Sequence, residues 1–349
     1  MTSGVQDHQA QQQTQQADAG QLARRLLGNV EQVVHGRRPA LELVACGLLA
    51  GGHVLVQDVP GSGKTTLARA FARSIGGTFR RIQATADLLP GDITGSSVWE
   101  PDRHGFVFVP GPVFAHVLLV DELNRATPRA QSALLEAMDE AAVTVDGVRH
   151  PLPEPFFVVA TQNPTDQHGT YPLPEGQLDR FAIALTLGEN DLATERQVVR
   201  EQLLRPTVDD LTAVISPDEL GAVQVRVRHT YVDDAVLDFA LQVVRGTRTH
   251  PRVRIGASSR AALALVRCAQ ARAVIFDRDW VLPDDVKVLA PFVLGHRLVL
   301  ERNAAQRAGS AVERLAGDRL ALDRLGAGAA VVGEVLAVIP VPVPVPVRT

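Results

Sequence analysis

Cysteine is scarce in this chain. Only 2 of the 349 residues are cysteines. Cys46 and Cys268 lie far apart in apolar, helical-looking stretches, and neither belongs to a CxxC pattern or a Cys/His cluster. We therefore expect both to be small core residues of a protein in a reduced cytosolic setting.

The chain also lacks an excess of basic charge and any long apolar run. Its 35 Lys and Arg against 39 Asp and Glu give a net charge of -4. This balance argues against a nucleic-acid backbone as the main partner, although it leaves room for a local basic patch. The N-terminus has no apolar signal segment, and apolar runs elsewhere are broken well short of a membrane span. We expect a cytoplasmic protein without membrane insertion.

The clearest local signal is the stretch over residues 54–70, which reads VLVQDVPGSGKTTLARA. Its apolar start predicts a buried strand and its apolar end predicts a helix, so P-G-S-G-K-T forms the loop between them. In such a phosphate loop the backbone N–H groups converge on phosphates, Lys64 reaches them, and the Thr65 hydroxyl binds Mg²⁺. The expected nucleotide-binding residues are Pro60, Gly61, Ser62, Gly63, Lys64, Thr65 and Thr66.

Asp58 occupies the position of the first glycine in the usual G-x-x-x-x-G-K-[ST] pattern. Because Asp can adopt a positive φ, the turn can survive this replacement. The alternative interpretation is a glycine-rich turn that binds no ligand.

Two further apolar runs end in polar residues. Residues 117–120 precede Asp121 and Glu122, and residues 156–160 precede the T-Q-N-P stretch that contains Asn163. In a doubly wound α/β sheet such residues meet at the carboxyl edge, where ligands bind. Asp121 is then a candidate to hold Mg²⁺, Glu122 to orient or deprotonate the attacking water, and Asn163 to contact the γ-phosphate and that water. The alternatives are a solvated Asp-Glu pair and a loop Asn that caps a turn.

The rest of the chain divides by composition and periodicity. We expect a disordered Gln-rich tail at 1–20, an α/β core at 21–189, a smaller all-helical domain at 190–339 and a Pro-rich tail at 340–349. The alternation over Phe106–Val109 predicts one arm of a hairpin inserted in the core, with its tip as a candidate contact surface. Beyond residue 190 we expect no strands, and helices over Glu195–Leu204, Asp234–Val244, Arg260–Ile275 and Asp284–Leu300.

Four stretches together resemble the MoxR-type AAA+ ATPases. They are DELNRATPRAQSALLEAM at 121–138, ATQNP at 160–164, GTYPLPEGQLDRF at 169–181 and GASSRA at 256–261. The resemblance covers about residues 21 to 300. It implies a P-loop NTPase core followed by a helical lid, and it implies that the Phe106–Val109 hairpin corresponds to the helix-2 insert of this clade.

The resemblance also implies roles for single residues. Lys64 and Thr65 become Walker A residues, Asp121 and Glu122 become Walker B residues, and Asn163 becomes sensor 1. Arg180 resembles the arginine finger that is given to a neighbouring subunit, and Arg260 resembles sensor 2. Without the resemblance both arginines would be interpreted as ordinary surface or ion-paired residues. Besides Asp58, the chain departs from the family at Ser259, where the family usually has Pro.

The resemblance implies a function that composition and spacing do not give. It implies a chaperone-like ATPase that uses ATP and Mg²⁺, assembles as a hexamer with nucleotide, and remodels or matures partner proteins with von Willebrand factor A domains. Two alternatives stay open: a nucleic-acid motor of a related AAA+ group, and an ATP-gated scaffold with little turnover.

Overall fold

The structure, a computed structural model, describes residues 19–58, 61–163, 170–188, 192–196, 200, 208–301 and 320–342. Its helices are residues 19–31, α2 (Arg38–Leu49), α3 (Lys64–Ser74), α4 (Pro90–Thr94), α5 (Pro128–Glu140), α6 (Glu175–Leu178), α8 (Pro217–Arg228), α9 (Asp234–Thr249), α10 (Ser259–Ile275), α11 (Pro283–Leu294) and α13 (Leu320–Val338). Its strands are β1 (His53–Gln57), β2 (Phe79–Gln83), β3 (Gly95–Glu100), β4 (Gly105–Pro110), β5 (Val117–Asp121), β6 (Ala142–Val145), β7 (Val148–Pro151), β8 (Phe157–Gln162), β9 (Phe181–Leu185), β10 (Val253–Ile255) and β11 (Val299–Leu300).

A five-stranded sheet of order β2-β5-β8-β1-β9 forms the centre of the α/β part, and all its neighbouring strands are parallel. All residues of β5 and of β9 are buried. Continuous apolar strands are expected in a parallel sheet, because helices cover both of its faces. The predicted doubly wound α/β core is confirmed.

The two faces of the sheet belong to two separate apolar cores. Val54 and Val56 of β1 pack in the core that includes α2 and α3, whereas Leu55 packs in the core that includes α5. This alternation follows from the period of two residues in a strand. The carboxyl ends of β1, β5 and β8 are thereby fixed side by side.

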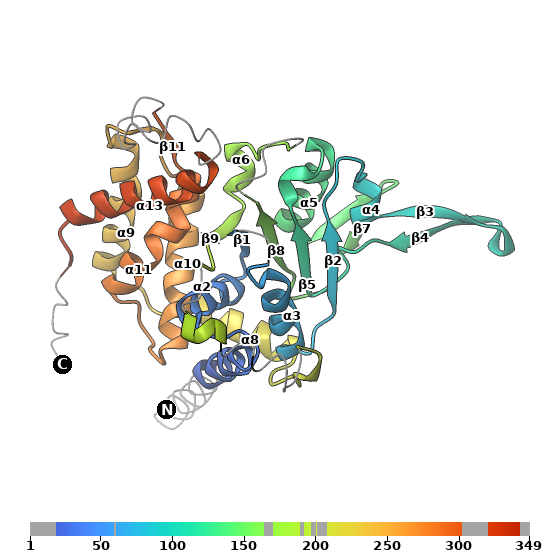
Figure 1. Ribbon diagram of the computed structural model, residues 1–349, viewed down its shortest axis with the longest axis horizontal. Coiled ribbons are helices and arrows are strands. Elements are labelled where there is room, and N and C mark those ends of the chain that lie inside the picture. The colour runs from blue at the N-terminus through green and yellow to red at the C-terminus, as the bar shows by residue number, and fades with distance from the viewer. Residues whose placement is uncertain are drawn as a thin grey trace, which may run out of the picture.

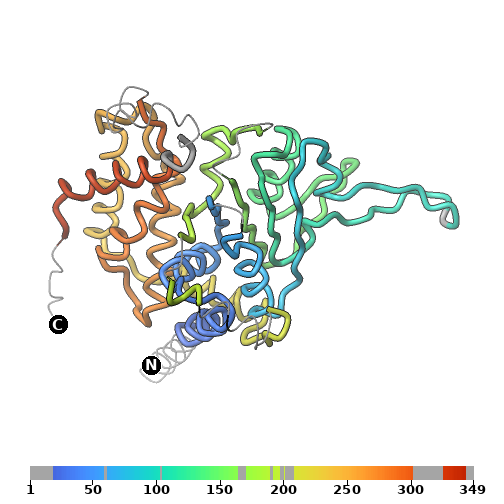
Figure 2. The backbone as a smooth tube through the Cα atoms, in the orientation of Figure 1, coloured from blue at the N-terminus to red at the C-terminus, as the bar shows by residue number. Residues whose placement is uncertain are grey.

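A long hairpin extends from the α/β part. Strands β3 and β4 pair antiparallel, and Figures 1 and 2 show them reaching far from the rest of the molecule. Trp99 and Phe106 lie on facing strands of this hairpin with their rings 5.4 Å apart, and their residues are 50% and 72% exposed. The predicted hairpin is confirmed, and it presents aromatic side chains to solvent.

Helices α9, α10, α11 and α13 gather on the other side of the sheet (Figure 1). Phe239, Leu265 and Leu289 from three of these helices belong to the same apolar core as α2. The helical part therefore packs directly against the α/β part through α2 and β9.

Two expectations for the helical part are wrong. Strands do occur beyond residue 190, because β10 pairs antiparallel with β11. The helix expected to run to Leu300 ends at Leu294, and a 3-10 turn, η4 (Gly295–Arg297), follows it. The chain turns there because His296 and Arg297 donate hydrogen bonds to β9. Helix α8, which we did not predict, begins with a capping box of Ser216 and Glu219 around Pro217.

The termini and the cysteines complete the comparison with the sequence. Residues 1–18 and 343–349, most of the two predicted tails, lie outside the described residues, as does most of the helix expected at Glu195–Leu204; Ala19 and Gly20 are already helical. Cys46 and Cys268 are buried free thiols, as predicted. Among the described residues, no helix is both long and apolar enough to span a membrane.

Candidate functional site

The loop between β1 and α3 has the backbone of a phosphate cradle. Gly61 and Gly63 have φ values of 84° and 87°, which only glycine adopts readily, and Gly63 caps α3 at its N-terminus. A Cβ atom built on either glycine meets nothing within 4 Å, so the loop faces open space. The first N–H groups of α3 have no partner within the helix and are available to an anion there.

Lys64 crosses this loop. Its Nζ donates to the Asp58 carbonyl at 2.9 Å and to the Ser62 Oγ at 3.3 Å. Partial burial lowers the pKa of Lys64, and the negative charges of Asp58, Asp121 and Glu122 oppose that shift. The ammonium group is thus held over the loop among carboxylates.

Asp58 does not do what we expected of it. Its φ is not positive, unlike that of five other non-glycine residues in the described part of the chain. The turn therefore does not depend on a left-handed backbone at this position. Its buried carboxylate accepts a hydrogen bond from the Leu187 N–H at 3.0 Å, and its own N–H donates to the Gln162 carbonyl at 3.2 Å. Asp58 therefore ties the start of the loop to the end of β8 and to the segment that follows β9.

Asp121 and Glu122 stand at the carboxyl end of β5, linked by one hydroxyl group. Thr161 donates its Oγ1–H to Asp121 Oδ1 at 3.2 Å and accepts from the Glu122 N–H at 3.0 Å. Arg81 of β2 pairs with Asp121 at 2.7 Å, and Arg125 pairs with Glu122 at 2.8 Å. Glu122 has a φ of 56°, an uncommon conformation for a residue other than glycine. Such outliers cluster at functional sites.

These groups line one cavity of about 320 Å³. Its lining residues are Gly61, Ser62, Gly63, Lys64, Thr65, Arg81, Gln83, Asp121, Glu122, Thr161 and Asn163. The structure thus brings together most of the predicted site, while Thr66 lies one residue beyond the lining and Pro60 lies outside the described residues.

Three cavity residues escaped the sequence analysis: Arg81, Gln83 and Thr161. Arg81 and Gln83 flank the buried Ile82 near the carboxyl end of β2, and this alternation is the sequence signal that could have found them. Thr161 is the first residue of the T-Q-N-P stretch, and only its hydrogen bonds to Asp121 and to the Glu122 N–H mark it as a site residue.

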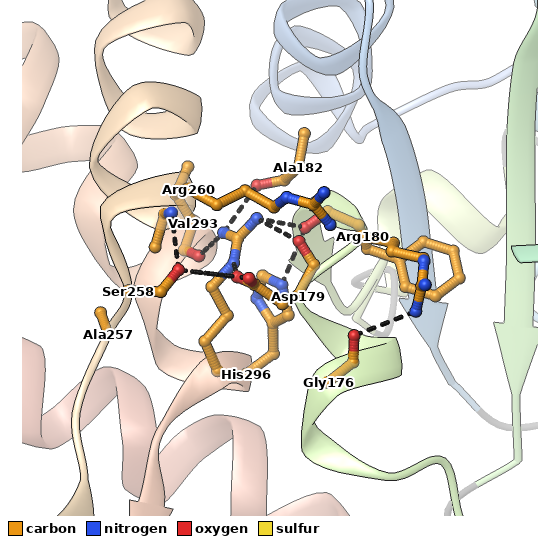
Figure 3. A network of polar contacts seen from close by, with 12 residues as sticks. Gly176, Asp179, Arg180, Ala182, Ala257, Ser258, Arg260, Val293 and His296 are labelled. Carbon is orange, nitrogen blue, oxygen red and sulfur yellow. Dashed lines mark hydrogen bonds and ion pairs between the residues drawn. The ribbon is translucent and has the colours of Figure 1, made fainter. Parts of the chain in front are cut away.

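Arg180 and Arg260 line a different cavity, of about 120 Å³, together with Asp139. Arg180 pairs with Asp139 at 2.6 Å, and Arg260 approaches the same carboxylate at 3.6 Å. Arg180 precedes β9, at the amino edge of the sheet, whereas the phosphate loop follows β1 at the carboxyl edge. Strands of five residues at about 3.3 Å per residue separate the two edges by about 16 Å. Figure 3 shows Arg260 reaching from the helical part toward the segment that carries Arg180, whose guanidinium turns to the Gly176 carbonyl.

Ser259, the second position at which the chain departs from the resemblance, is the first residue of α10. Proline is favoured at that position because its φ suits a helix start and its missing N–H is not needed. The neighbouring Ser258 caps the helix by accepting from the Ala261 N–H at 3.1 Å. The helix start is thus kept by a side-chain cap.

Comparison with known proteins confirms the family that the sequence resembles. Residues 53–183 match the ATPase family associated with various cellular activities (AAA), and residues 245–316 match the AAA lid domain. The protein named Chaperone MoxR1 of Mycobacterium tuberculosis is 39% identical over 289 residues, covering 80% of this chain and 76% of that protein. The chain belongs to the MoxR family of AAA+ ATPases.

Two other proteins are similar to this chain over most of its length. YeaC of Bacillus subtilis is 44% identical over 289 residues, which is 83% of this MoxR-family chain and 90% of YeaC. A solved structure of a candidate ATPase from Cytophaga hutchinsonii has a TM-score of 0.83 and 30% identity, and the match covers 96% of this chain and 99% of that one. Membership in the MoxR family supports nucleotide binding and ATPase activity.

The cavity fits a nucleotide with Mg²⁺. Its volume is in the usual range of ligand sites, and it combines a glycine loop, a lysine, a hydroxyl and a carboxylate. No group of three or more metal-binding side chains occurs in the part of the chain that the structure describes. Mg²⁺ is commonly held by one or two carboxylates together with substrate phosphates, and Thr65 and Asp121 of the cavity are the residues that would hold it.

Proposed function

We propose that this chain hydrolyses ATP with Mg²⁺ and uses that energy to remodel or mature partner proteins with von Willebrand factor A domains. The observation that carries the proposal is the cavity that gathers Lys64, Thr65, Asp121, Glu122 and Asn163 at one edge of the sheet. Two buried free thiols support a reducing cytoplasm as its place of work.

Each residue of the cavity has a part in the reaction. Lys64 and the N–H groups at the start of α3 bind the β- and γ-phosphates, and Thr65 and Asp121 hold Mg²⁺. Held by these two side chains, Mg²⁺ would supply positive charge to the phosphates and polarise the bond that breaks. Glu122 orients a water molecule and accepts its proton, and Asn163 holds that water against the γ-phosphate.

Arg180 and Arg260 act on the nucleotide of a neighbouring subunit. Arg180 precedes β9 at the amino edge of the sheet, about 16 Å from the carboxyl edge by the strand rise of about 3.3 Å per residue, and Arg260 shares its partner Asp139. An arginine that neutralises charge in the transition state must therefore come from another copy, which requires a ring or a stack. In keeping with the family resemblance, we propose a hexamer formed with nucleotide.

The β3–β4 hairpin favours a protein partner over nucleic acid. Its exposed large side chains include Val98, Trp99, Phe106 and Val109, each at least 50% exposed. Aromatic and apolar surfaces of this kind mark protein contacts, whereas nucleic-acid sites are rich in Lys and Arg. A pull-down with Glu122→Gln and ATP identifies the partner, and recovery of nucleic acid alone would favour the motor alternative.

Mixing two inactive variants tests the assignment across subunits. Arg180→Ala keeps its own ATP site but offers no finger, and Lys64→Ala keeps its finger but binds no ATP. Each alone should lose most turnover, by about a thousandfold for Arg180→Ala. A 1:1 mixture should recover about a quarter of the parental phosphate release, because random assembly joins an intact site to an intact finger at about one interface in four.

An inactive mixture, together with a monomer as the active parental species, would refute the proposal. Withholding Mg²⁺ should abolish phosphate release by the parent, and adding it back should restore the activity.

A further inference from the structure

The segment that carries Arg180 is held by a buried arginine of the helical part. Arg297, in η4 after α11, is only 6% exposed. Its Nε donates to Asp179 Oδ1 at 2.8 Å, and its Nη2 donates to the carbonyls of Asp179 at 3.1 Å and Phe181 at 2.8 Å. Its Nη1 donates to the Ala182 carbonyl at 3.4 Å and to that of Val293. One guanidinium therefore grips the backbone on both sides of Arg180.

The sheet leaves these carbonyls available to Arg297. Strand β9 is at the end of the sheet, so one of its sides has no strand partner in the part of the chain that the structure describes. The register of β9 against β1 also shifts, because His53 faces Phe181 while Val54 faces Ile183, which leaves Ala182 as an extra residue. Bulges of this kind interrupt the ladder and redirect neighbouring side chains. At this point Arg297 takes the place of a neighbouring strand.

Two further contacts join the same segment to the helical part. Ser258, which caps α10, donates its hydroxyl to Asp179 Oδ2 at 3.2 Å. The Nε2 atom of His296 lies 3.0 Å from the carbonyl oxygen of Phe181. Figure 3 shows Asp179 between Ser258 and the segment that carries Arg180, with His296 beside it. The start of α10 and the end of α11 thus converge on residues 179–182.

We propose that Arg297 is a positioning residue for the arginine finger, which fixes Arg180 to the helical part so that the two move as one body. The proposal rests on the role of Arg180 under the proposed function. Because Arg297 holds Asp179, Phe181 and Ala182, any displacement of α11 moves the backbone that aims Arg180. The position of the helical part in one subunit therefore determines the rate of ATP hydrolysis in its neighbour.

Arg297→Lys is the substitution that tests this. Lysine keeps the positive charge opposite Asp179, but it loses the planar fork that reaches several acceptors at once. The buried carbonyls of the segment then lose hydrogen-bond donors, and the position of the Arg180 side chain becomes less well defined. A misplacement of about 1 Å can reduce a rate by about a hundredfold.

The mixed-subunit assay separates this role from general damage to the fold. Arg297→Lys is placed either in Lys64→Ala subunits, which only donate the finger, or in Arg180→Ala subunits, which only hold ATP. In donors we expect the recovered kcat to fall by about tenfold to a hundredfold, with KM for ATP unchanged. In ATP-holding subunits we expect no loss, because Arg297 has no finger to position there.

The helical part offers a matched control. Asp285 is fully buried, and Arg278 pairs with it at 2.7 Å, away from residues 176–182. Arg278→Lys in donor subunits disturbs a comparable buried ion pair and should leave the recovered activity intact. Asp179→Asn in donors is the second variant, and it should reproduce the loss seen with Arg297→Lys.

The outcomes are distinct. If the unmodified mixture recovers no activity and the active parental species is a monomer, the proposed function fails in its assignment of Arg180. If that mixture recovers activity and Arg297→Lys donors match it, or if both placements of Arg297→Lys lose activity equally, the positioning role is wrong and the proposed function stands. A loss confined to donors and absent from Arg278→Lys supports the positioning role.

Discussion

Asp58 should make the phosphate loop more stable and its affinity for nucleotide lower. The buried carboxylate accepts the Leu187 N–H at 3.0 Å, and hydrogen bonds to charged groups contribute about 1.5–3 kcal/mol. Replacement by glycine, the usual residue of the pattern, removes this bond and adds backbone freedom worth about 0.5–1 kcal/mol. We expect Asp58→Gly to lower the free energy of unfolding by about 2–4 kcal/mol.

Asp58→Asn separates the charge from the hydrogen bond. The amide oxygen can still accept from the Leu187 N–H, so the loss of stability should be smaller than for glycine. Lys64 and the bound phosphates no longer share the loop with the Asp58 carboxylate, so Asp58→Asn should bind ATP more tightly than the parent. Urea unfolding and titration with a fluorescent ATP analogue measure the two effects.

Two results would refute this reasoning. Equal stability of Asp58→Gly and the parent would mean that the bond to Leu187 contributes nothing. Weaker nucleotide binding by a folded Asp58→Asn would mean that the carboxylate assists binding, contrary to the charge argument.

Three further substitutions test the cavity itself. Lys64→Ala should abolish binding of the fluorescent analogue, since it removes the positive charge held over the loop; unchanged binding would contradict the loop assignment. Glu122→Gln should keep ATP affinity and lose phosphate release, because the amide accepts no proton; undiminished release would point to a scaffold that needs no such base. Thr161→Val should lower kcat by about tenfold with ATP binding intact, since Asp121 and the Glu122 N–H lose their shared hydroxyl, and Thr161→Ser should restore it.

The sequence allowed prediction of the parts whose signals are local. The strand-loop-helix over residues 54–70 and the apolar run before Asp121 depend on periodicity and on glycine chemistry, so their place at one sheet edge followed from the α/β pattern alone. The apolar faces of α9 and α10 could also be predicted, because their apolar residues recur with the helical period. The end of α11 was not, because contacts from His296 and Arg297 to a strand more than 100 residues away decide it.

The same limit applies to the charged residues. Asp139, Asp179 and Arg297 look like ordinary surface residues in the sequence, and only the folded chain joins them to Arg180. For Asp58 the sequence led us to expect a backbone role, a positive φ in the turn. The structure instead shows a side-chain role, the hydrogen bond that its carboxylate accepts from the Leu187 N–H. Long-range polar contacts follow no period, so pattern analysis does not detect them.

Two buried histidines should make the stability depend on pH. His53 accepts from the Val158 N–H through Nδ1 at 3.1 Å, and burial lowers its pKa to about 4. Burial, with the nearby Arg297 charge, lowers the pKa of His296 to about 3. Both are neutral in the folded protein and protonate near pH 6.5 when unfolded, so their stabilising effect is complete above pH 6.5 and is lost as the pH falls toward 4 and 3.

Between pH 6.5 and 5.0 each histidine should lower the free energy of unfolding by about 2 kcal/mol, at about 1.4 kcal/mol per pH unit. The two histidines together should lower it by about 4 kcal/mol. Carboxyl groups titrate mostly below this window. Urea unfolding at pH 7.5 and pH 5.0 should show that difference in the parent and about half of it in His53→Asn, whatever the starting stability of the variant. An equal loss in both proteins would mean that His53 titrates alike folded and unfolded, and that its hydrogen bond to Val158 does not keep it neutral.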